Sequence, residues 1–391
     1  MHPIVIIGSG MAGYTLAREF RKLNAEQALM MICADDATNY AKPTLSNALT
    51  AKKQPEQIAL GDAEKMSAQL NMRIENQAMV KRIDAQNHQV YVEQNGENLV
   101  FDYSRLILAL GASPIRLNIA GNANADLHVV NHINDYKAFR TKIDQLTEKR
   151  IAILGAGLIG CEFANDLQNA GYQTTVIDLA ATPLSRLLPV NVSSEFQNKL
   201  ESSGIKFVLD TSVDKIEKAN SVFFIELANG QKLEADVVLS AIGLQANTEI
   251  AKAANIATAR GIITNAHLET NQADIFAIGD CAEVEGTLLP YVMPIMQQAR
   301  ALAKTLNGDK TAVHYPAMPV AVKTPAAPLT VLPVPINIDV NWETEVLEDG
   351  LIAKAVDSSD TLRGFVLLGA TAGKQRLALA KLVPDLIPFS V

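Results

Sequence analysis

Two glycine-rich segments, each placed directly after a short apolar run, constrain this chain more than any other feature. The apolar runs are Ile4 to Ile7 and Ile151 to Leu154, and the segments behind them read Gly8-Ser9-Gly10-Met11-Ala12-Gly13 and Gly155-Ala156-Gly157-Leu158-Ile159-Gly160. Between a strand and a helix, the first two glycines of a G-x-G-x-x-G turn let the backbone approach a pyrophosphate, and the third lets the helix pack on the strand. The pyrophosphate then lies at the positive end of the helix. Two motifs in this context predict two dinucleotide-binding sites in one chain.

The rest of the chain repeats one order of elements around each motif. After each glycine segment we expect a helix, a second strand, an antiparallel meander and an apolar strand that ends at glycine, such as Leu106 to Gly111 and Val237 to Gly243. Residues 314–391 differ, because they carry many prolines and short alternating strands. The pattern predicts an α/β protein with two Rossmann-like dinucleotide-binding domains, each with an antiparallel meander insertion, and a small C-terminal α+β domain.

Charge and cysteine content narrow the choice of partners and compartment. A formal net charge of −8 argues against nucleic acid or an anionic membrane as the main partner. No apolar run approaches the ~20 residues that span a bilayer, and the start of the chain does not have the pattern of a signal peptide, so we expect no membrane insertion and a cytoplasmic protein. Cys33, Cys161 and Cys281 have neither a pairing pattern nor metal-ligand spacing. We therefore expect reduced, buried thiols and no metal site.

The acidic residue that follows each glycine motif differs between the two sites. Asp178 ends its strand about twenty residues after the second motif, the usual place for a carboxylate that binds a ribose. The next arginine is Arg186, too late to hold a 2′-phosphate, so the second motif is predicted to bind NADH. After the first motif the strand ends at Cys33 and Ala34, whose backbone groups are expected to hold the adenosine ribose. Asp35 follows one place later, and either a ribose contact or a solvated turn would explain it.

A strand that ends in Gly279-Asp280 indicates which dinucleotide the first site holds. Ligands of open α/β sheets bind at the carboxyl ends of the strands, and a carboxylate there suits the ribityl hydroxyls of a flavin. Pro294 is expected at the start of the next helix, whose positive end could stabilise negative charge on a reduced flavin ring. The first site is therefore predicted to hold one non-covalent FAD. The expected domains are an FAD-binding domain at 1–114 and 239–313, an NADH-binding domain at 115–238 and a C-terminal interface domain at 314–391.

Taken together, these motifs resemble the FAD-dependent pyridine-nucleotide-disulfide reductase superfamily over essentially the whole chain. The segments most similar to its rubredoxin-reductase branch are Ala41 to Ser46, Gly157 to Leu167, Gly279 to Val284 and Val322 to Pro325. Related ferredoxin-type reductases carry R-P-P-L-S-K where this chain has Lys42-Pro43-Thr44-Leu45-Ser46-Asn47. The last lysine is therefore missing, and an ion pair from that position to Glu162 cannot form. This departure favours the rubredoxin branch.

The resemblance implies roles for individual residues. The implied FAD contacts are Ser9 to Ala12 at the pyrophosphate, Val80 at the adenine, Asp280 at the ribityl chain, Val292 at the isoalloxazine edge, and Lys42 and Lys323 beside the ring. Glu162 would lie where nicotinamide meets flavin, and with the two lysines it forms the implied catalytic set. From the residues alone, core packing would also explain the two valines, and ordinary solvent exposure would explain the two lysines.

One missing cysteine separates this chain from much of the superfamily. Disulfide reductases of this kind need a redox cysteine pair after the first βαβ unit or a C-x-x-C in the NAD domain, and the peroxidases need one cysteine in the first location. The matching stretch, Asn39 to Ala48, contains no cysteine. We interpret Cys161 and Cys281 as packing residues.

The resemblance implies an electron transferase that takes a hydride from NADH and passes single electrons to rubredoxin, in the service of alkane hydroxylation. The alternatives are a ferredoxin-type reductase and an NADH oxidase or quinone-type reductase that reduces a small molecule. A different class is a flavin-bound NADH sensor whose third domain is a binding module. Composition and periodicity do not indicate the acceptor, which is implied by the resemblance alone.

Overall fold

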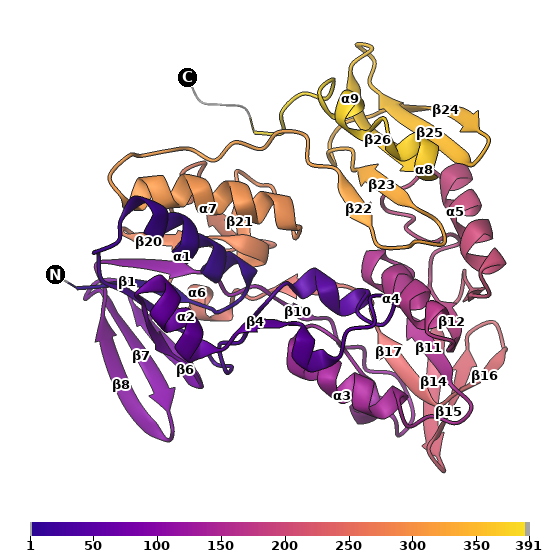
Figure 1. Cartoon of the computed structure of the whole chain (residues 1–391), viewed down its shortest axis with the longest axis horizontal. Helices are drawn as coiled ribbons and strands as arrows, with labels where there is room; N and C mark the ends of the chain where they lie inside the picture. Colours follow the sequence, from indigo (N-terminus) through magenta and orange to yellow (C-terminus); the bar gives the residue numbers. More distant parts are fainter. Residues whose placement is uncertain (1, 388–391) are drawn as a thin grey trace.

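In the computed structural model, which describes residues 2–387, two parallel sheets and one antiparallel sheet organise the chain (Figure 1). The strands of the first parallel sheet lie in the order β20 (Ile275–Ala277), β9 (Arg105–Leu108), β1 (Ile4–Ile7), β2 (Leu29–Ile32) and β5 (Arg73–Glu75). β1 pairs on both sides and all of its residues are buried, which explains its uninterrupted apolar run. The helices of this unit are α1 (Met11–Leu23), α2 (Ala63–Leu70), α6 (Glu249–Ala253) and α7 (Val292–Leu306).

The second parallel sheet is built in the same way around the second glycine motif. Its strands lie in the order β13 (Lys206–Val208), β12 (Gln173–Ile177), β11 (Arg150–Leu154) and β17 (Val237–Ser240). Its helices are α3 (Ile133–Ile143), α4 (Leu158–Asn169) and α5 (Val190–Ser202). Each parallel sheet carries one antiparallel meander, composed of β6 (Ala78–Asp84), β7 (Gln89–Gln94) and β8 (Glu97–Asp102) in the first unit and β14 (Val213–Ala219), β15 (Val222–Leu227) and β16 (Lys232–Ala235) in the second. The predicted α/β architecture is confirmed.

Two short antiparallel strands mark where the chain passes between the parallel sheets. β10 (Ala112–Pro114) carries it out of the first unit and β18 (Leu244–Ala246) brings it back, with Ala112 opposite Ala246. The boundary expected after residue 238 has to move, because it would divide β17, which pairs with β11 along its whole length. Hydrogen bonding along the full strand keeps all of β17 in the second sheet.

The C-terminal unit is an antiparallel sheet with two short helices. The strand order is β22 (Val320–Val322), β23 (Leu329–Leu332), β26 (Leu362–Leu368), β25 (Gly350–Val356) and β24 (Asn341–Leu347), followed in the chain by α8 (Ala370–Gly373) and α9 (Arg376–Ala380). Side chains alternate between its faces. Leu351 and Val366 join a core shared with α4 and α5, whereas Ile352 and Leu367 pack with Leu379 of α9.

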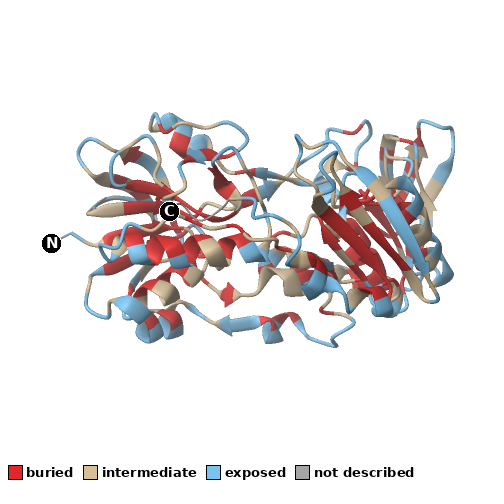
Figure 2. Ribbon diagram, turned by 90° about the horizontal axis from the view of Figure 1, so that it is seen from above, coloured by how far each residue is buried: buried red, intermediate tan, exposed pale blue. Residues whose placement is uncertain are grey.

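Short elements complete the fold around the strand ends. They are β3 (Asn39–Tyr40), β4 (Ala59–Gly61), β19 (Ile262–Thr264) and β21 (Ala282–Val284), with the 3-10 turns η1 (Lys42–Ser46), η2 (Pro55–Gln57), η3 (Asn124–Asp126) and η4 (Gly279–Cys281). Seen from above, the buried residues gather in two bodies, one around the first sheet and one where the second and C-terminal sheets meet (Figure 2). No helix between residues 2 and 387 combines the length and apolarity that a membrane span requires.

Candidate active site

The two glycine loops share one geometry in which each glycine has a different role. Gly8 and Gly155 adopt φ of 116° and 106°, and a Cβ on them would lie 2.2 Å from the Ala109 oxygen and 2.6 Å from the Ala241 oxygen. These loops therefore pass against the end of the neighbouring strand, where only glycine fits. The third glycines hold helix against loop, because a Cβ on Gly13 would lie 2.1 Å from the oxygen of Gly8 and one on Gly160 would lie 1.9 Å from that of Gly155.

The middle glycine of each loop faces open space. A Cβ on Gly10 or Gly157 would have no described atom within 4 Å beyond its own chain neighbours. Both residues are also the N-caps of their helices, α1 and α4, and neither helix has a side-chain cap. The first backbone N–H groups of Met11 and Ala12 in α1 therefore have no acceptor within the helix. Space and free donors at a positive helix end fit a pyrophosphate at each loop.

The strand end after the first motif directs a carboxylate at the glycine loop. Ser9 Oγ donates a hydrogen bond to Asp35 Oδ1 at 2.7 Å, and Ala37 N donates to the same oxygen at 3.0 Å. Both backbone groups of Cys33 are occupied, since its N–H donates to Glu75 O and its carbonyl accepts from Ala78 N. Asp35 is therefore part of the loop and not a solvated turn, and together with Ala34 it is the better candidate for the ribose.

Asp178 occupies the corresponding place in the second site. Its Oδ2 accepts from Ala156 N at 2.5 Å and its Oδ1 accepts from Ala180 N at 2.7 Å, so the carboxylate lies against the glycine loop. The shallow hollow just beyond it is lined by Leu179, Asp210, Thr211, Ser212, Ala228 and Asn229. This lining contains no basic side chain that could hold a 2′-phosphate.

Lys42 and Asp280 form an opposed pair of charges beside the first loop. Burial lowers the pKa of Lys42 and raises the pKa of Asp280, and in each case the opposite charge of the other residue counteracts the shift. Between residues 2 and 387 neither side chain has a hydrogen bond or an ion pair within 4.0 Å. A half-buried cation and anion without direct partners fit a ligand that carries its own polar groups, such as the ribityl chain and ring edge of a flavin.

Gly279 ties Asp280 to the first glycine loop and to α7. A Cβ on Gly279 would lie 2.7 Å from Ala12 Cβ, and its N–H donates to Gln298 Oε1 of α7 at 2.6 Å. α7 begins at Val292, so the expectation that the helix starts at Pro294 is wrong, and Val292 is its first residue. Proline is tolerated at the third position because no first-turn N–H has an acceptor within the helix. Val292 is 38% exposed, so it is not a core residue.

Val80 lies within β6, opposite Val92 of β7, just before a shift of register between Val80 and Arg82. Its side chain is partly buried and packs against the core of the first unit. The packing explains the side chain, and a backbone contact to adenine stays a prediction.

Glu162 lies at the junction of all three units. It is 6% exposed on α4, and it accepts hydrogen bonds from Ser46 Oγ at 2.6 Å, Lys323 Nζ at 2.5 Å and the Lys323 backbone N–H at 3.0 Å. Asn47 cannot supply an ion pair to Glu162, as the sequence indicated, but Lys323 of the C-terminal unit supplies one. The three candidate catalytic residues thus occupy two clusters, Lys42 with Asp280 and Glu162 with Lys323.

Two further residues of α4 that were missed from the sequence hold this junction together. Asp166 accepts from the backbone N–H groups of Thr50 at 2.7 Å and Leu49 at 3.1 Å, and Asn165 Oδ1 accepts from Ala326 N at 3.1 Å. The signal was available, because polar residues at positions 162, 165 and 166 share one face of a helix whose residues 158–164 are otherwise apolar.

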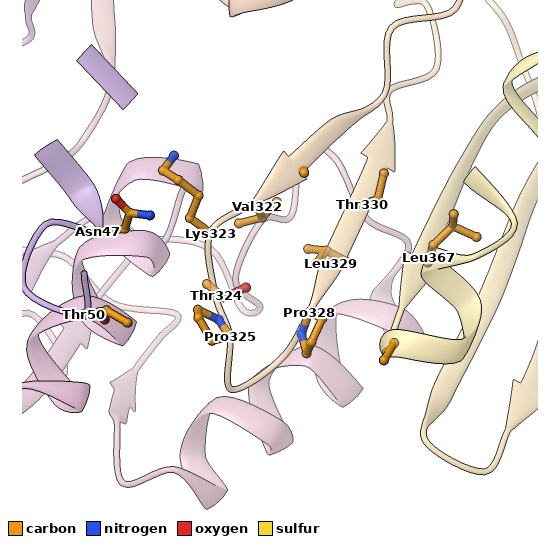
Figure 3. Close-up of a pocket in the computed structure, with 14 residues that line it drawn as sticks. Asn47, Thr50, Val322, Lys323, Thr324, Pro325, Pro328, Leu329, Thr330 and Leu367 are labelled. Carbon is orange, nitrogen blue, oxygen red and sulfur yellow. The ribbon is translucent and has the colours of Figure 1, made fainter. Parts of the chain in front are cut away.

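A groove of about 380 Å³ runs along the outside of the same junction (Figure 3). Asn47 and Thr50 lie on one side of it, the loop from Lys323 to Pro328 forms its floor, and Leu367 lies on the far side. The groove therefore follows the contact between the first unit and the C-terminal sheet.

All three cysteines are buried and unpaired. Burial raises the pKa of the Cys33, Cys161 and Cys281 thiols, that of Cys281 to about 12. Cys161 and Cys281 each lie near a backbone carbonyl, Ala156 O and Leu108 O, at 3.4 Å. Thiols held neutral in this way are poor nucleophiles, which agrees with their interpretation as packing residues.

A comparison with known families identifies the arrangement. The sequence model described as pyridine nucleotide-disulphide oxidoreductase matches residues 2–304. The chain belongs to this family. A second model, described as the rubredoxin binding C-terminal domain, matches residues 312–383, close to the third domain expected from the sequence. The FAD cofactor and the NADH substrate predicted from the glycine motifs agree with this membership.

Individual members of the family are similar to this chain over nearly its whole length. The chain is 67% identical over 390 residues to the rubredoxin-NAD(+) reductase of Acinetobacter baylyi, covering 99% of both chains, and 40% identical to that of Alcanivorax borkumensis, covering 99% of this chain and 100% of the relative. Among solved structures, the putidaredoxin reductase of a covalent complex with putidaredoxin has a TM-score of 0.87 at 23% identity, covering 98% of this chain and 94% of that one. The latter likeness shows the fold.

Proposed function

We propose that this protein oxidises NADH and passes single electrons to rubredoxin. The observation that carries the proposal is the contact of Lys323 with Glu162, because it brings the unit matched by the rubredoxin-binding model to the meeting point of the two dinucleotide sites. The identity to the Acinetobacter baylyi reductase over the whole chain supports the same function. The proposed FAD-binding domain is 1–114 with the segment from β18 to 313, the NADH-binding domain runs from 115 to the end of β17, and the interface domain begins at 314.

In the proposed mechanism each cluster has one task. FAD, when bound, supplies the conversion between a two-electron hydride donor and a one-electron carrier. The open face of Gly10 and the free N–H groups of α1 bind its pyrophosphate, and Asp280 binds its ribityl hydroxyls. Lys42 and the N-terminus of α7 place positive charge next to the ring.

The second cluster orients NADH. Gly157 and the N-terminus of α4 bind the pyrophosphate, while Asp178 binds the ribose. Ser46 and Lys323 hold Glu162 in place, so its carboxylate is a fixed polar group between the two dinucleotide sites. We also place the protein in the cytoplasm, where its unpaired cysteines stay reduced.

Single-turnover kinetics test this function against its alternatives. Anaerobic mixing with NADH is expected to bleach the flavin, and rubredoxin is expected to restore its colour faster than oxygen or a quinone does. A faster return with oxygen or quinone would contradict the proposal and favour an oxidase. A long-lived complex that NADH barely reduces would favour a sensor. Dithionite should deliver two electrons per FAD, because no thiol lies in the segment that other family members use. Delivery of the electrons to an alkane hydroxylase stays a prediction.

A further inference from the structure

One surface of the C-terminal unit combines exposed leucines with cations. On α9 and the residues around it, Leu377 is 68% exposed and Leu382 is 65% exposed, while Leu379 between them is buried in the core of this unit. Leu377 lies on α9, and Lys374 and Lys381 lie in the turns that flank this helix; all three residues are exposed, whereas Leu379 is buried. We call Lys374, Arg376, Leu377, Lys381 and Leu382 the α9 surface.

The cations of this surface have no internal partner. Within the described part of the chain, the side chains of Lys374, Arg376 and Lys381 make no hydrogen bond and have no carboxylate within 4.0 Å. The nearest acid in sequence, Asp385, lies 2.7 Å from His314 Nε2. A chain with a net charge of −8 thus presents a local positive patch that is edged by apolar side chains. Internal packing explains neither the charge nor the exposed leucines, and both are typical of a surface that binds an acidic partner.

A short series of contacts leads from this surface to the first dinucleotide site. The chain directly after the α9 surface returns to Tyr315, whose side chain lies in the core of the first unit, and Leu386 N donates to Tyr315 O at 2.8 Å. The Tyr315 hydroxyl accepts from Gln298 Nε2 at 2.6 Å, and Gln298 Oε1 accepts from Gly279 N, next to Asp280. The segment that follows the α9 surface is therefore tied to the strand end that carries Asp280 through the buried side chains of Tyr315 and Gln298.

We propose that the α9 surface is where the acidic face of a small iron–sulphur carrier docks. This inference rests on the proposed function, and it adds the location and the chemistry of the contact. The lysines and arginine attract the acidic carrier and orient it, and the two leucines give the apolar contact that holds it during electron transfer.

The test is a charge reversal with a matched control. The variant Lys374→Glu with Lys381→Glu is expected to raise KM for rubredoxin about tenfold at low ionic strength, and the difference should shrink at about 0.5 M salt. Reduction of ferricyanide by NADH should be unchanged, because that small acceptor needs no docking surface. The control, Lys206→Glu with Lys252→Glu, changes the net charge by the same amount as the test variant. Both control lysines are exposed, and neither forms an ion pair with any residue between 2 and 387. It should leave KM near the wild-type value.

A second variant tests the apolar part. Leu377→Ser with Leu382→Ser should also raise KM for rubredoxin, with a salt dependence like that of the wild type. If the wild-type protein does not reduce rubredoxin at all, the proposed function itself fails. If the wild type does so but the charge-reversed variant matches its control, only the docking surface is wrong. A change in oligomeric state of the leucine variant would show that a second copy occupies the surface and would overturn the proposal.

Discussion

Glu162 and Lys323 are separated by 161 positions in the chain and come from different structural units, yet their side chains meet at 2.5 Å. The Lys323 backbone N–H donates to the same carboxylate, so both the side chain and the loop are held. Ser46 adds a third unit to the contact. This carboxylate therefore fixes the relative position of the two dinucleotide-binding units and the C-terminal unit.

Replacing Lys323 with methionine should weaken this junction. Glu162 would keep Ser46 and one backbone donor but lose its ion-pair partner, and since Lys323 is partly solvated we expect a loss of about 1–3 kcal/mol in the free energy of unfolding, together with slower flavin reduction by NADH. Urea unfolding and stopped-flow absorbance would measure the two effects. The double variant with Glu162→Gln should lose less free energy of unfolding than the two single variants lose in sum. A strictly additive loss would contradict a direct interaction between the two side chains.

The middle glycines should separate binding of the two dinucleotides. Gly10→Val places atoms in the open face of the first loop, so the protein should fold, bind NADH and lack FAD. Gly157→Val should remain yellow and lose NADH affinity, as measured by flavin content and by NADH titration. Gly13→Ala is a contrasting case, because its Cβ would lie 2.1 Å from a backbone oxygen and should impair folding. Equal loss of both ligands in either valine variant would contradict the assignment of the loops.

Asp178→Ala should raise KM for NADH about tenfold or more, since a hydrogen bond to a charged group contributes roughly 1.5–3 kcal/mol. The same change should reduce the preference of the enzyme for NADH over NADPH. Part of the effect should come from the loop, because Ala156 N and Ala180 N lose their acceptor. Asp178→Asn retains one acceptor oxygen, so its KM for NADH should lie between those of the wild type and of Asp178→Ala. A wild-type enzyme that already prefers NADPH would disprove the assignment.

Asp280→Asn should weaken FAD binding but raise the stability of the apoprotein at neutral pH. Burial raises the pKa of Asp280 above its ordinary value of 3.8, so the folded apoprotein binds this proton more tightly than the unfolded chain does. The stability of the apoprotein should therefore fall as pH rises from about 4 through the raised pKa, as the carboxylate becomes charged without a direct partner. The variant should show less of this decline and a higher Tm at neutral pH, but weaker FAD binding. Thermal scans of both apoproteins across that pH range would show whether the two curves differ in slope, and parallel curves would contradict the argument.

Most of the fold was predictable because its signals are local. Apolar runs next to glycine turns specify strand, loop and helix within about thirty residues, and parallel sheets follow from that order. The start of α7 was misplaced because proline is permitted at more than one position in a first turn, and local sequence does not choose between them. Asp35 was left open because its partner, Ser9, lies 26 positions earlier in the chain.

The sequence by itself determined that this protein has two dinucleotide sites, which cofactor each one suits, and that the stretch Asn39 to Ala48 contains no cysteine. Each of these conclusions rests on short motifs that can be interpreted without knowing what packs against them. Only the tertiary structure decided that Lys323 pairs with Glu162, that Asp166 and Asn165 hold the neighbouring units, and that the cations of the α9 surface have no internal partner. Those outcomes depend on which distant surfaces pack together, and packing is a property of the whole folded chain that no local pattern records.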